Sequence, residues 1–435
     1  MSRNIDSYVS VEKTISILLK NIKISRKTEL INVYEGLGRV LDQDVISNRN
    51  VPEYPTSHMD GFAVRSVDIN NGSLNEPVFL KISTSGSVPG KSSSYFHKKG
   101  QATRINTGGS MPRGSDTVIP IEDVSVMDKD EIKITKSLKK GSFVYLTGSD
   151  IKKGKKVMSK EQVIRAQHMG LLATLHISKI SVYEKPVVSI IPTGNELTDN
   201  IQELSNTSSK LQNKIVNTNS HIISSLVKEL GGIPIDLGIT PDNTHALKNK
   251  ITKALRSSDL ILTVGGTSAG EHDIVKSTIN QMGSPGMIAN KVKLDRGRVA
   301  GIAALGDKPL LLLPGPVQGA LNAFLVFARP LIALLTGRNN PQVLTLPAIL
   351  NQDWTSRKKF SNFKKVVYIK VSKIRSKNLL TASPIVGETQ SISLLSEANA
   401  FVIVPENVRK LSKGDVVQFS LLPGFSYIHD LQVID

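Results

Sequence analysis

The chain has 435 residues, of which 39% are hydrophobic and 21% are charged, and this length predicts a globular protein of about two to four domains. Its sequence contains no cysteine, which excludes disulfides, zinc sites built from thiolates and cysteine nucleophiles. It lacks a run of about eighteen apolar residues and a signal-peptide pattern, so we expect a cytoplasmic protein without a membrane span.

The net charge of +18, from 55 Lys and Arg against 37 Asp and Glu, favours an anionic partner. Nucleic acid, a membrane surface and a polyanionic small ligand all fit that charge. The basic residues are dispersed in short clusters, such as 152–156 and 357–359, and dispersed lysine is more typical of a solvated surface than of a binding stripe. We therefore expect no nucleic-acid or membrane partner, and we expect Trp354, Phe360 and Phe363 to pack a hairpin rather than to stack on bases.

The first part of the chain predicts two helical stretches and a β-rich domain. Residues 11–22 have helical periodicity, and residues 28–47 predict a helix that leads into an extended segment. From about residue 51 to residue 142, short β-like runs alternate with Gly, Pro, Ser and Asn, which is typical of an all-β domain. Residues 154–180 then predict a turn, a helix and a strand.

From about residue 185 to residue 337 the pattern changes to alternating strands and helices. Continuous apolar strands are predicted at 186–194, 233–239 and 259–266, and helices at 220–232, 245–258 and 273–283. This alternation predicts a doubly wound parallel sheet with helices on both faces. After about residue 338 short β runs return, and they predict a small C-terminal β domain.

The stretch LTVGGTSAGEHD ends the third of these strands. In parallel sheets ligands bind beyond the carboxyl ends of the strands, and Gly265, Gly266 and Gly270 let the backbone approach a ligand closely. The glycine spacing fits neither the dinucleotide fingerprint nor the P-loop, so on the glycines alone a plain strand-to-helix turn is an equally good interpretation. Asp273 has the alternative interpretation of a helix N-cap.

Carboxylates follow all three of these strands. Thr193, Gly194 and Glu196 follow the first strand, Asp242 follows the second and Asp273 follows the third. Each carboxylate alone is explained by a cap or a turn. Together they predict a site that holds Mg²⁺ or accepts hydrogen bonds from the N–H groups of a pterin or a purine.

Six stretches resemble, in order, the motifs of the molybdopterin molybdenumtransferase family, which includes the MoeA proteins and the E domain of gephyrin. They are HMDGFAVR (58–65), RINTGGSMPRGSDTVIPIED (104–123), PTGNEL (192–197), VNTNSHIISSLVKELGG (216–232), GGTSAGEHDIVK (265–276) and QSISLLSEANAFVIVPE (390–406). The resemblance covers nearly the whole chain. A single motif would be weak, but the ordered set is specific.

The resemblance implies a transferase that inserts molybdenum from molybdate into adenylated molybdopterin, with Mg²⁺ or a similar divalent ion, and releases AMP. It also implies a homodimer whose active site combines the α/β domain of one subunit with the β-rich domain of the other. A molybdopterin adenylyltransferase is an expected partner. The implied fold has four domains: an elongated, discontinuous dimerisation domain (1–50 and 143–180), a β-rich domain (51–142), an α/β molybdopterin-binding domain (181–338) and a C-terminal β domain (339–435).

The strand ends and the resemblance together predict the site residues. Catalytic roles are expected for Glu196, Asp273, Asp60 and Asp150, and metal binding for Glu196 and Asp242. Substrate binding is expected for Thr107, Thr193, Gly194, Asp242, Gly265, Gly266, Ser268, Gly270, Arg298, Pro314 and Gly315. His58, beside Asp60, stands where the family has a small residue, and we expect it to pack there rather than to bind a ligand.

The chain departs from the family where anions are handled. The family's KPGKP loop is represented by DRGRV, which has Asp295 at one lysine position and Arg298 at the other. Arg296 and Arg298 flank Asp295, and if they neutralise it the loop stays cationic overall. We expect the oxyanion to bind more weakly than in relatives that have the lysine pair. The segments 145–147 and 313–317 also depart from the family pattern. Two alternatives therefore stay open: a diverged paralogue that uses tungstate, and a non-catalytic molybdopterin-binding or scaffold protein.

Overall fold

The structure of the protein is a computed structural model that describes residues 8–83, 96–128, 130–204, 214–266, 274–339, 344–374, 379–423 and 432–434. The chain divides into two compact units. The larger unit comprises Met1–Glu29, Gly38–Asp42 and Val182–Asp435, and the smaller unit comprises Leu30–Leu37 and Gln43–Ser181.

The larger unit contains a six-stranded sheet with the order β16–β13–β17–β20–β19–β18. These strands are β13 (Val187–Thr193), β16 (Ile233–Asp236), β17 (Leu260–Gly265), β18 (Pro285–Ala289), β19 (Gly301–Leu305) and β20 (Lys308–Leu313). β16, β13, β17 and β20 pair in parallel, which confirms the predicted parallel sheet, whereas β18 and β19 pair antiparallel. β19 turns directly into β20 through a tight hairpin at Gly306, and so short a connection joins only antiparallel strands.

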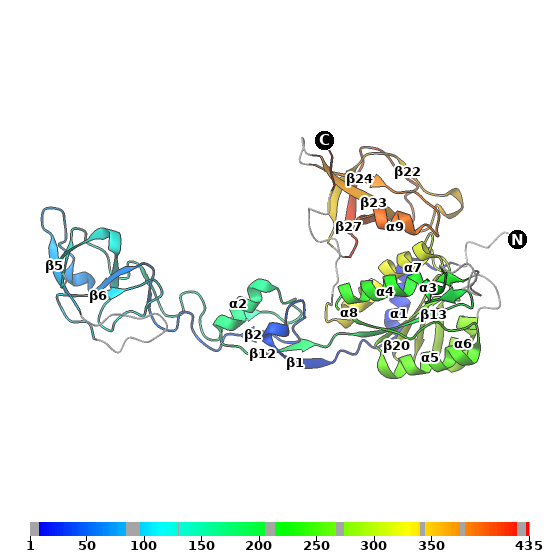
Figure 1. Cartoon of the computed structure of the whole chain (residues 1–435), viewed down its shortest axis with the longest axis horizontal. Coiled ribbons are helices and arrows are strands. Elements are labelled where there is room, and N and C mark those ends of the chain that lie inside the picture. The colour runs from blue at the N-terminus through cyan, green and yellow to red at the C-terminus, as the bar shows by residue number, and fades with distance from the viewer. Residues whose placement is uncertain are drawn as a thin grey trace. The chain divides into compact units, whose positions relative to one another are not determined.

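Helices cover both faces of this sheet (Figure 1). They are α1 (Val11–Asn21), α4 (Thr218–Glu229), α5 (Thr244–Ser257), α6 (Ile274–Met282), α7 (Val317–Ala323) and α8 (Arg329–Leu335). α1, α4, α7 and α8 share one hydrophobic core with the sheet, whereas α5 and α6 share another. The central strands are buried on both sides, which is why they are continuously apolar.

α7 and α8 are joined by a π-helical turn, Phe324–Ala328, into one helical run. Among the described residues this run, Val317–Leu335, alone is long and apolar enough to cross a membrane by length and composition. Its apolar window is 83% buried inside the structure, as in the core helix of a folded domain.

The C-terminal part of the larger unit is a six-stranded sheet with the order β24–β21–β27–β25–β23–β28, and a further pairing of β24 with β23 closes it into a barrel-like form. Its strands are β21 (Leu346–Leu350), β23 (Lys365–Ile374), β24 (Leu379–Pro384), β25 (Ala400–Val404), β27 (Val416–Leu421) and β28 (Gln432–Ile434). The short strands β22 (Trp354–Thr355) and β26 (Lys410–Leu411) pair beside it, and α9 spans Ile392–Glu397. The ring of Phe363 packs on the rings of Tyr8 and Phe360.

The smaller unit is built around a six-stranded sheet with the order β7–β4–β6–β5–β9–β8. These strands are β4 (Gly61–Val64), β5 (Val78–Ile82), β6 (Gln101–Ile105), β7 (Thr117–Pro120), β8 (Val124–Asp128) and β9 (Glu131–Ile134). The unit also contains two separate two-stranded pairs and a helix. β3 (Thr56–Ser57) pairs with β10 (Val144–Tyr145), β2 (Val45–Ile46) pairs with β11 (Lys156–Met158), and α2 spans Ala166–Thr174. Its core is aliphatic, with Phe62 as the aromatic member.

The N-terminal region differs from the sequence-based expectation in two ways. Residues 28–47 are not helical: they contain β1 (Thr28–Asn32), a 3-10 turn at Val33–Glu35 and β2. The β-branched residues and the glycines there favour extended chain and turns over helix. In addition, α1 packs on the α/β sheet through Val11 and Leu18, although residues 1–50 were assigned to the discontinuous domain. The four-domain division as a whole stays a prediction.

Candidate functional site

The carboxyl ends of three parallel strands meet at one edge of the α/β sheet. Thr193 of β13 lies in register with Gly265 of β17, and Val264 of β17 lies in register with Leu313 of β20. Beyond this edge is a cavity of about 510 Å³. Its walls come from these strand ends, from the start of α4, from the loop that precedes α7 and from the start of α9.

Glycines at the end of β17 bring its backbone against β13. Gly265 and Gly266 have φ values of +85° and +64°, a left-handed conformation that other residues rarely adopt. A Cβ atom on Gly265 would lie 2.6 Å from the carbonyl oxygen of Thr193. Gly265 therefore has to be glycine, and this part of the cavity wall is bare backbone.

Glu196 is positioned by a tight turn after β13. Gly194 has a φ value of +147°, and a Cβ atom there would lie 2.5 Å from both carboxylate oxygens of Glu196. The carboxylate therefore folds back over the Cα atom of Gly194, and Glu196 lines the cavity. Because the side chain is exposed, its charge can be removed without disturbing the core.

Hydrogen bonds hold the loop after β16 against the turn that follows β13. The carboxylate of Asp242 accepts a hydrogen bond from the backbone N–H of Asn195 (3.2 Å), and the side-chain oxygen of Asn195 accepts one from the backbone N–H of Asp242 (3.2 Å). The backbone N–H of Gly194 donates to the carbonyl of Thr240 (3.1 Å). The structure thus brings Glu196 and Asp242 to one edge of the sheet, although Asp242 does not line the cavity.

Three of the predicted site residues lie outside the residues that the structure describes. They are Ser268, Gly270 and Asp273. Their expected contributions stay predictions.

Two asparagines at the start of α4 add amide groups to the cavity wall, and the sequence analysis did not assign them to the site. Asn217 caps the helix, because its side-chain oxygen accepts a hydrogen bond from the backbone N–H of Ser220 (3.4 Å) and another from the hydroxyl of Ser220 (2.9 Å). Asn219 donates from Nδ2 to the carbonyl of Gly315 (2.7 Å). The Oδ1 atom of Asn219 is buried and has no hydrogen-bond partner among the described residues. The Asn-Thr-Asn run between a strand and a helix was the sequence signal for this pair.

A second pocket adjoins the cavity at Pro316, which lines both. Its volume is about 240 Å³, and its wall includes Pro314 and the loop Asp295–Val299. Arg298, the predicted substrate-binding cation, lines this pocket rather than the larger cavity. The two other residues predicted from this region are also divided. Gly315 lines the larger cavity, whereas Pro314 lines the smaller pocket.

Three cations lie around the ring of Phe360, which lines this pocket. The guanidinium carbons of Arg298 and Arg357 lie 5.0 Å and 5.5 Å from the centroid of the Phe360 ring, and the ammonium of Lys359 lies 5.9 Å from it. At such distances the face of the ring attracts a cation. Asp295 is the one acidic residue among those that line the pocket, so the described wall is cationic overall.

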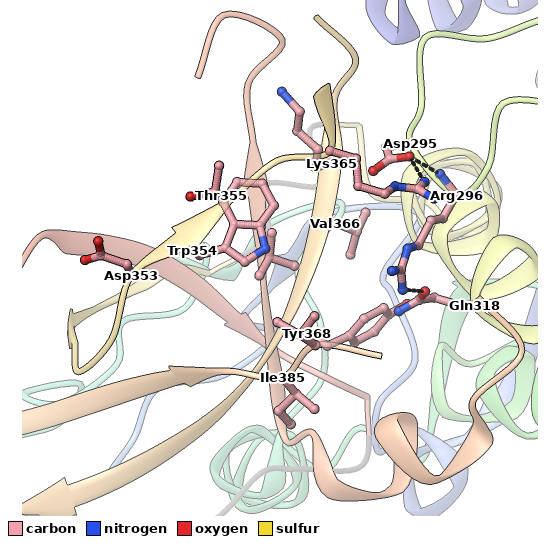
Figure 2. A pocket seen from close by; sticks show the side chains of 13 residues that line it. Asp295, Arg296, Gln318, Asp353, Trp354, Thr355, Lys365, Val366, Tyr368 and Ile385 are labelled. Carbon is pink, nitrogen blue, oxygen red and sulfur yellow. Dashed lines mark hydrogen bonds and ion pairs between the residues drawn. The ribbon is translucent and has the colours of Figure 1, made fainter. Parts of the chain in front are cut away.

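The carboxylate of Asp295 is paired with a cation from another segment of the chain. Its carboxylate forms an ion pair with Arg357 of the C-terminal domain, whereas the guanidinium of Arg296 donates to Gln318 (Figure 2). Arg357 is separated from Asp295 by 62 residues in sequence, so no local pattern could identify it.

A buried hydrogen-bond chain holds the Asp295–Val299 loop in place. Nδ2 of Asn322 donates to the carbonyl of Asp295 (3.2 Å), and the hydroxyl of Tyr368 donates to Oδ1 of Asn322 (2.8 Å). Burial raises the pKa of Tyr368, so its hydroxyl remains a donor. Burial, and after it the charge of Arg357, lowers the pKa of Arg296. Arginine nevertheless stays charged in proteins, so Arg296 adds a cation to this loop.

In the smaller unit the structure brings Asp60 and Thr107 together. Oδ1 of Asp60 accepts hydrogen bonds from the backbone N–H of Thr107 (2.6 Å) and from its hydroxyl (3.0 Å). These two bonds lower the pKa of Asp60, which keeps the carboxylate ionised. His58 packs its ring on Tyr145, with centroids 3.4 Å apart, in agreement with the expected packing role.

The predicted site residues are divided between the two units. Asp60, Thr107 and Asp150 belong to the smaller unit, and the other predicted site residues belong to the larger unit. Asp150 is exposed, and its backbone N–H donates to the carbonyl of Val51 (3.1 Å).

The acidic residues fit a divalent ion only in a particular way. Among the described residues no three His, Asp or Glu side chains gather as a metal site. Mg²⁺ commonly takes one or two protein carboxylates and completes its shell with water and substrate phosphates. Glu196 on the cavity wall and Asp242 on the adjoining turn supply oxygen donors of that kind and number. They therefore fit an ion that binds together with a phosphate-bearing substrate, and not a closed protein cage.

Known sequence families match most of the chain in three consecutive segments. Residues 9–175 match the MoeA N-terminal region (domain I and II). Residues 189–334 match the "probable molybdopterin binding domain", and residues 347–422 match the MoeA C-terminal region (domain IV).

Relatives with assigned names agree with these matches. A molybdopterin biosynthesis protein of Methanocaldococcus jannaschii is 31% identical over 97% of this chain and 99% of its own length. A molybdopterin molybdenumtransferase of Nostoc is 31% identical over 75% of this chain and 74% of its own length. The crystal structure of the molybdopterin biosynthesis MoeA protein from Pyrococcus horikoshii aligns with a TM-score of 0.79 and 29% identity, covering 95% of this chain and 99% of that one.

Proposed function

The chain belongs to the MoeA family of molybdopterin molybdenumtransferases, and we propose that it inserts molybdenum from molybdate into adenylated molybdopterin and releases AMP. It is thus a transferase of molybdenum cofactor biosynthesis. In the proposed reaction, water cleaves the phosphoanhydride bond between molybdopterin and AMP, and the two dithiolene sulfurs replace two oxygens of molybdate, which take up protons and leave as water. Both substrates are anions, so the protein has to offset their mutual repulsion.

The observation that carries this proposal is the junction of two unlike pockets at Pro316. The cavity of about 510 Å³ is lined mainly by backbone, amide and aliphatic groups, and Oδ1 of Asn219, which has no hydrogen-bond partner among the described residues, would accept a hydrogen bond from a pterin N–H group. The pocket of about 240 Å³ presents Arg298 and its neighbouring cations to a small oxyanion. A pterin and an oxyanion in these two places lie next to each other.

Glu196 is the side chain that we propose acts at this junction. Its carboxylate lines the cavity and is exposed, so it is available to a substrate or to an ion. With Asp242, it would hold a Mg²⁺ ion bound to the substrate phosphates, and such an ion would supply positive charge to the phosphoanhydride. Chelation followed by add-back of Mg²⁺ tests this point, with binding of the adenylated substrate measured beside turnover.

We propose further that the active protein is a homodimer, because the predicted site residues are divided between the two units of the chain. Asp60 and Thr107 would act with Glu196 and Asp242 of a second subunit. Mixing an Asp60→Asn variant with a Glu196→Gln variant is expected to restore about a quarter of wild-type activity, since half of the dimers would each contain one intact site. A fully active monomer at micromolar concentration would exclude a shared site.

A tungstate-specific paralogue is the second candidate function, and the Asp295–Arg357 ion pair is the departure from the family that keeps it open. The pair places an anion in the pocket that we assign to the oxyanion, where the family has a lysine. The resulting change in charge alters how strongly the pocket attracts each oxyanion. A scaffold that has lost catalysis is the third candidate, and retention of Glu196, Asp242 and Asp60 speaks against it.

The cellular setting is also a proposal. We expect the protein to work in the cytoplasm and to receive its substrate from a molybdopterin adenylyltransferase. The sequence pattern and the chemistry of the substrate support this expectation. Faster cofactor formation with adenylyltransferase-bound substrate than with the same concentration of free substrate would support direct transfer, and equal rates would exclude it.

The experiment that tests the proposed function is cofactor formation in vitro. Purified protein is supplied with adenylated molybdopterin and with molybdate or tungstate, with and without Mg²⁺, and AMP and the metal-bound pterin are quantified. We expect AMP release that depends on the oxyanion and is lost in Glu196→Gln. Release with tungstate alone would assign the paralogue function, and release with neither oxyanion would exclude a metal transferase.

A further inference from the structure

The larger unit contains a further cavity, of about 370 Å³, that shares no residue with the two pockets of the proposed active site. It is formed by α1, by the helical run from Phe324 to Leu335 and by segments that include β25 of the C-terminal domain. Most of its wall is aliphatic, with Ile15, Leu325, Val326 and Ile403 among the lining residues.

Arg329 lines this cavity, and its charge has no carboxylate partner among the described residues. Its Nη1 atom is buried and has no hydrogen-bond partner among the described residues. Its guanidinium carbon lies 5.8 Å from the centroid of the Phe401 ring. Burial lowers the pKa of Arg329, and no carboxylate among the described residues offsets that effect. Because arginine remains protonated, the cavity wall contains a buried cation that no described carboxylate compensates.

The other ionisable groups of the wall leave this charge uncompensated. Glu12 is the one acidic residue among those that line the cavity, and its carboxylate is paired with Lys364. The lining therefore has an excess of positive charge over an aliphatic surface, which complements a ligand that has one anionic end and an apolar body.

We propose that this cavity binds a small amphipathic carboxylate, with the carboxylate on Arg329 and the alkyl chain along the aliphatic wall. A carboxylate and a guanidinium form two parallel hydrogen bonds, which would satisfy the buried Nη1 atom. A phosphate group would bury more charge and more acceptor oxygens than one unpaired arginine satisfies. The cavity volume, about 370 Å³, is roughly twice that of an engineered cavity that holds benzene, so it accommodates a chain of several carbons. The proposal does not depend on the molybdenum chemistry.

Calorimetric titration of the full-length protein with a series of carboxylates tests the proposal. The probes are sodium acetate, butanoate, hexanoate and octanoate, with 1-octanol as the uncharged analogue of the longest chain. We expect octanoate to bind at least ten-fold more tightly than acetate, which lacks the chain, and than 1-octanol, which lacks the charge. Equal affinity for octanoate and 1-octanol, or no binding of octanoate at millimolar concentration, would overturn the proposal.

Variants separate a binding role of Arg329 from a structural one. Arg329→Gln is expected to weaken octanoate binding at least ten-fold without lowering the Tm of the unliganded protein, because removal of a buried charge offsets the lost contact with the ring of Phe401. Lys13→Gln makes the same charge change on the exposed face of α1, away from the cavity wall, and should change the affinity less than two-fold. Leu344 lines the cavity but is 80% exposed, so Leu344→Glu should fold and should also weaken binding by repulsion. A lower Tm for Arg329→Gln, or unchanged octanoate binding in it, would contradict the proposal.

Discussion

The two pockets that meet at Pro316 are built in different ways. The larger cavity is formed by strand ends and helix starts, so glycine conformation and backbone register determine its shape. The smaller pocket is formed by long charged side chains that come from segments far apart in sequence. The first kind of site tolerates little change in its backbone, whereas the second can be retuned by single charge substitutions. The following predictions test this difference, from the largest expected effect to the smallest.

Removing the charge of Glu196 should have the largest effect on turnover. Glu196→Gln keeps the shape of the side chain and removes the charge that faces the cavity, so we expect kcat to fall at least about 100-fold, the usual cost of losing one electrostatic contact to the transition state. Because Glu196 is exposed, the Tm of Glu196→Gln should differ from that of the wild type by no more than is usual for a surface substitution. Glu229→Gln, also exposed but at the end of α4, is the matched control and should retain wild-type kcat. Wild-type turnover of Glu196→Gln would remove this residue from the mechanism.

The backbone at the end of β17 should be the next most sensitive feature. Gly265→Ala adds a Cβ atom 2.6 Å from the carbonyl oxygen of Thr193 in a left-handed conformation, so we expect the free energy of unfolding to fall by about 1–3 kcal/mol and activity to be lost. Gly306→Ala is the matched control, because Gly306 has a φ value of +59° but open space around its Cβ position. The loss of stability in Gly306→Ala gives the cost of placing alanine in a left-handed conformation without a steric clash. Chemical denaturation of both variants measures the difference, and equal losses would mean that the contact with Thr193 is unimportant.

The smaller pocket should respond to the charge of Asp295. Asp295→Lys removes the anion that pairs with Arg357, so we expect molybdate or tungstate to bind about ten-fold more tightly, a change of about 1.4 kcal/mol. The effect is limited by solvent, because the side chain of Arg357 is 47% exposed. The gain should shrink as ionic strength rises.

Asp353→Asn is the control for this prediction. Asp353 is exposed and paired with Lys410 (2.7 Å). It lines a neighbouring cavity of about 150 Å³ that Asp295 also lines, from the opposite side in the view of Figure 2. Its removal should leave oxyanion affinity unchanged. Titration of both variants at two salt concentrations gives the answer, and identical affinities for wild type and Asp295→Lys would show that this loop does not face the oxyanion.

The smallest effect is expected in the smaller unit, at Asp60. Hydrogen bonds from Thr107 lower the pKa of Asp60 in the folded protein, so they contribute stability above the unfolded pKa of about 3.9, and this contribution is lost as the pH falls through the folded pKa. Thr107→Val removes the hydroxyl donor but keeps the backbone N–H, so the pKa should rise only part of the way back. NMR titration of carboxyl-labelled aspartate measures the pKa of Asp60. The Asp60 signal is identified by its absence from the spectrum of Asp60→Asn. A pKa unchanged by Thr107→Val would show that the hydroxyl bond is not formed in solution.

The same contrast explains how much was predictable from sequence. The parallel sheet, the glycines at the end of β17 and the placing of Glu196 and Asp242 at one edge follow from local patterns, because continuous apolar strands and the turns after them determine that edge. The antiparallel strands β18 and β19 were missed, because an apolar run does not reveal strand direction. Arg357 as the partner of Asp295 also depends on long-range packing, which a sequence without tertiary contacts does not contain.

The buried supports of the site were missed for a related reason. Asn322 and Tyr368 lie within apolar stretches of a helix and a strand, where periodicity identifies them only as core positions. Their hydrogen bonds to each other and to the carbonyl of Asp295 appear only once the C-terminal barrel packs on the loop. The Asn-Thr-Asn run at the start of α4 was visible in the sequence, but a helix cap explains such a run equally well.

The central claim is that the two pockets that meet at Pro316 hold the pterin and the oxyanion side by side. A crystal structure of the protein with adenylated molybdopterin and tungstate, with anomalous diffraction to locate tungsten, tests it most directly. We predict a tungsten peak in the pocket lined by Arg298 and Pro314, and a pterin ring whose N–H group donates to Oδ1 of Asn219. Tungsten bound away from Arg298, or a pterin that leaves Asn219 without a partner, would contradict the account.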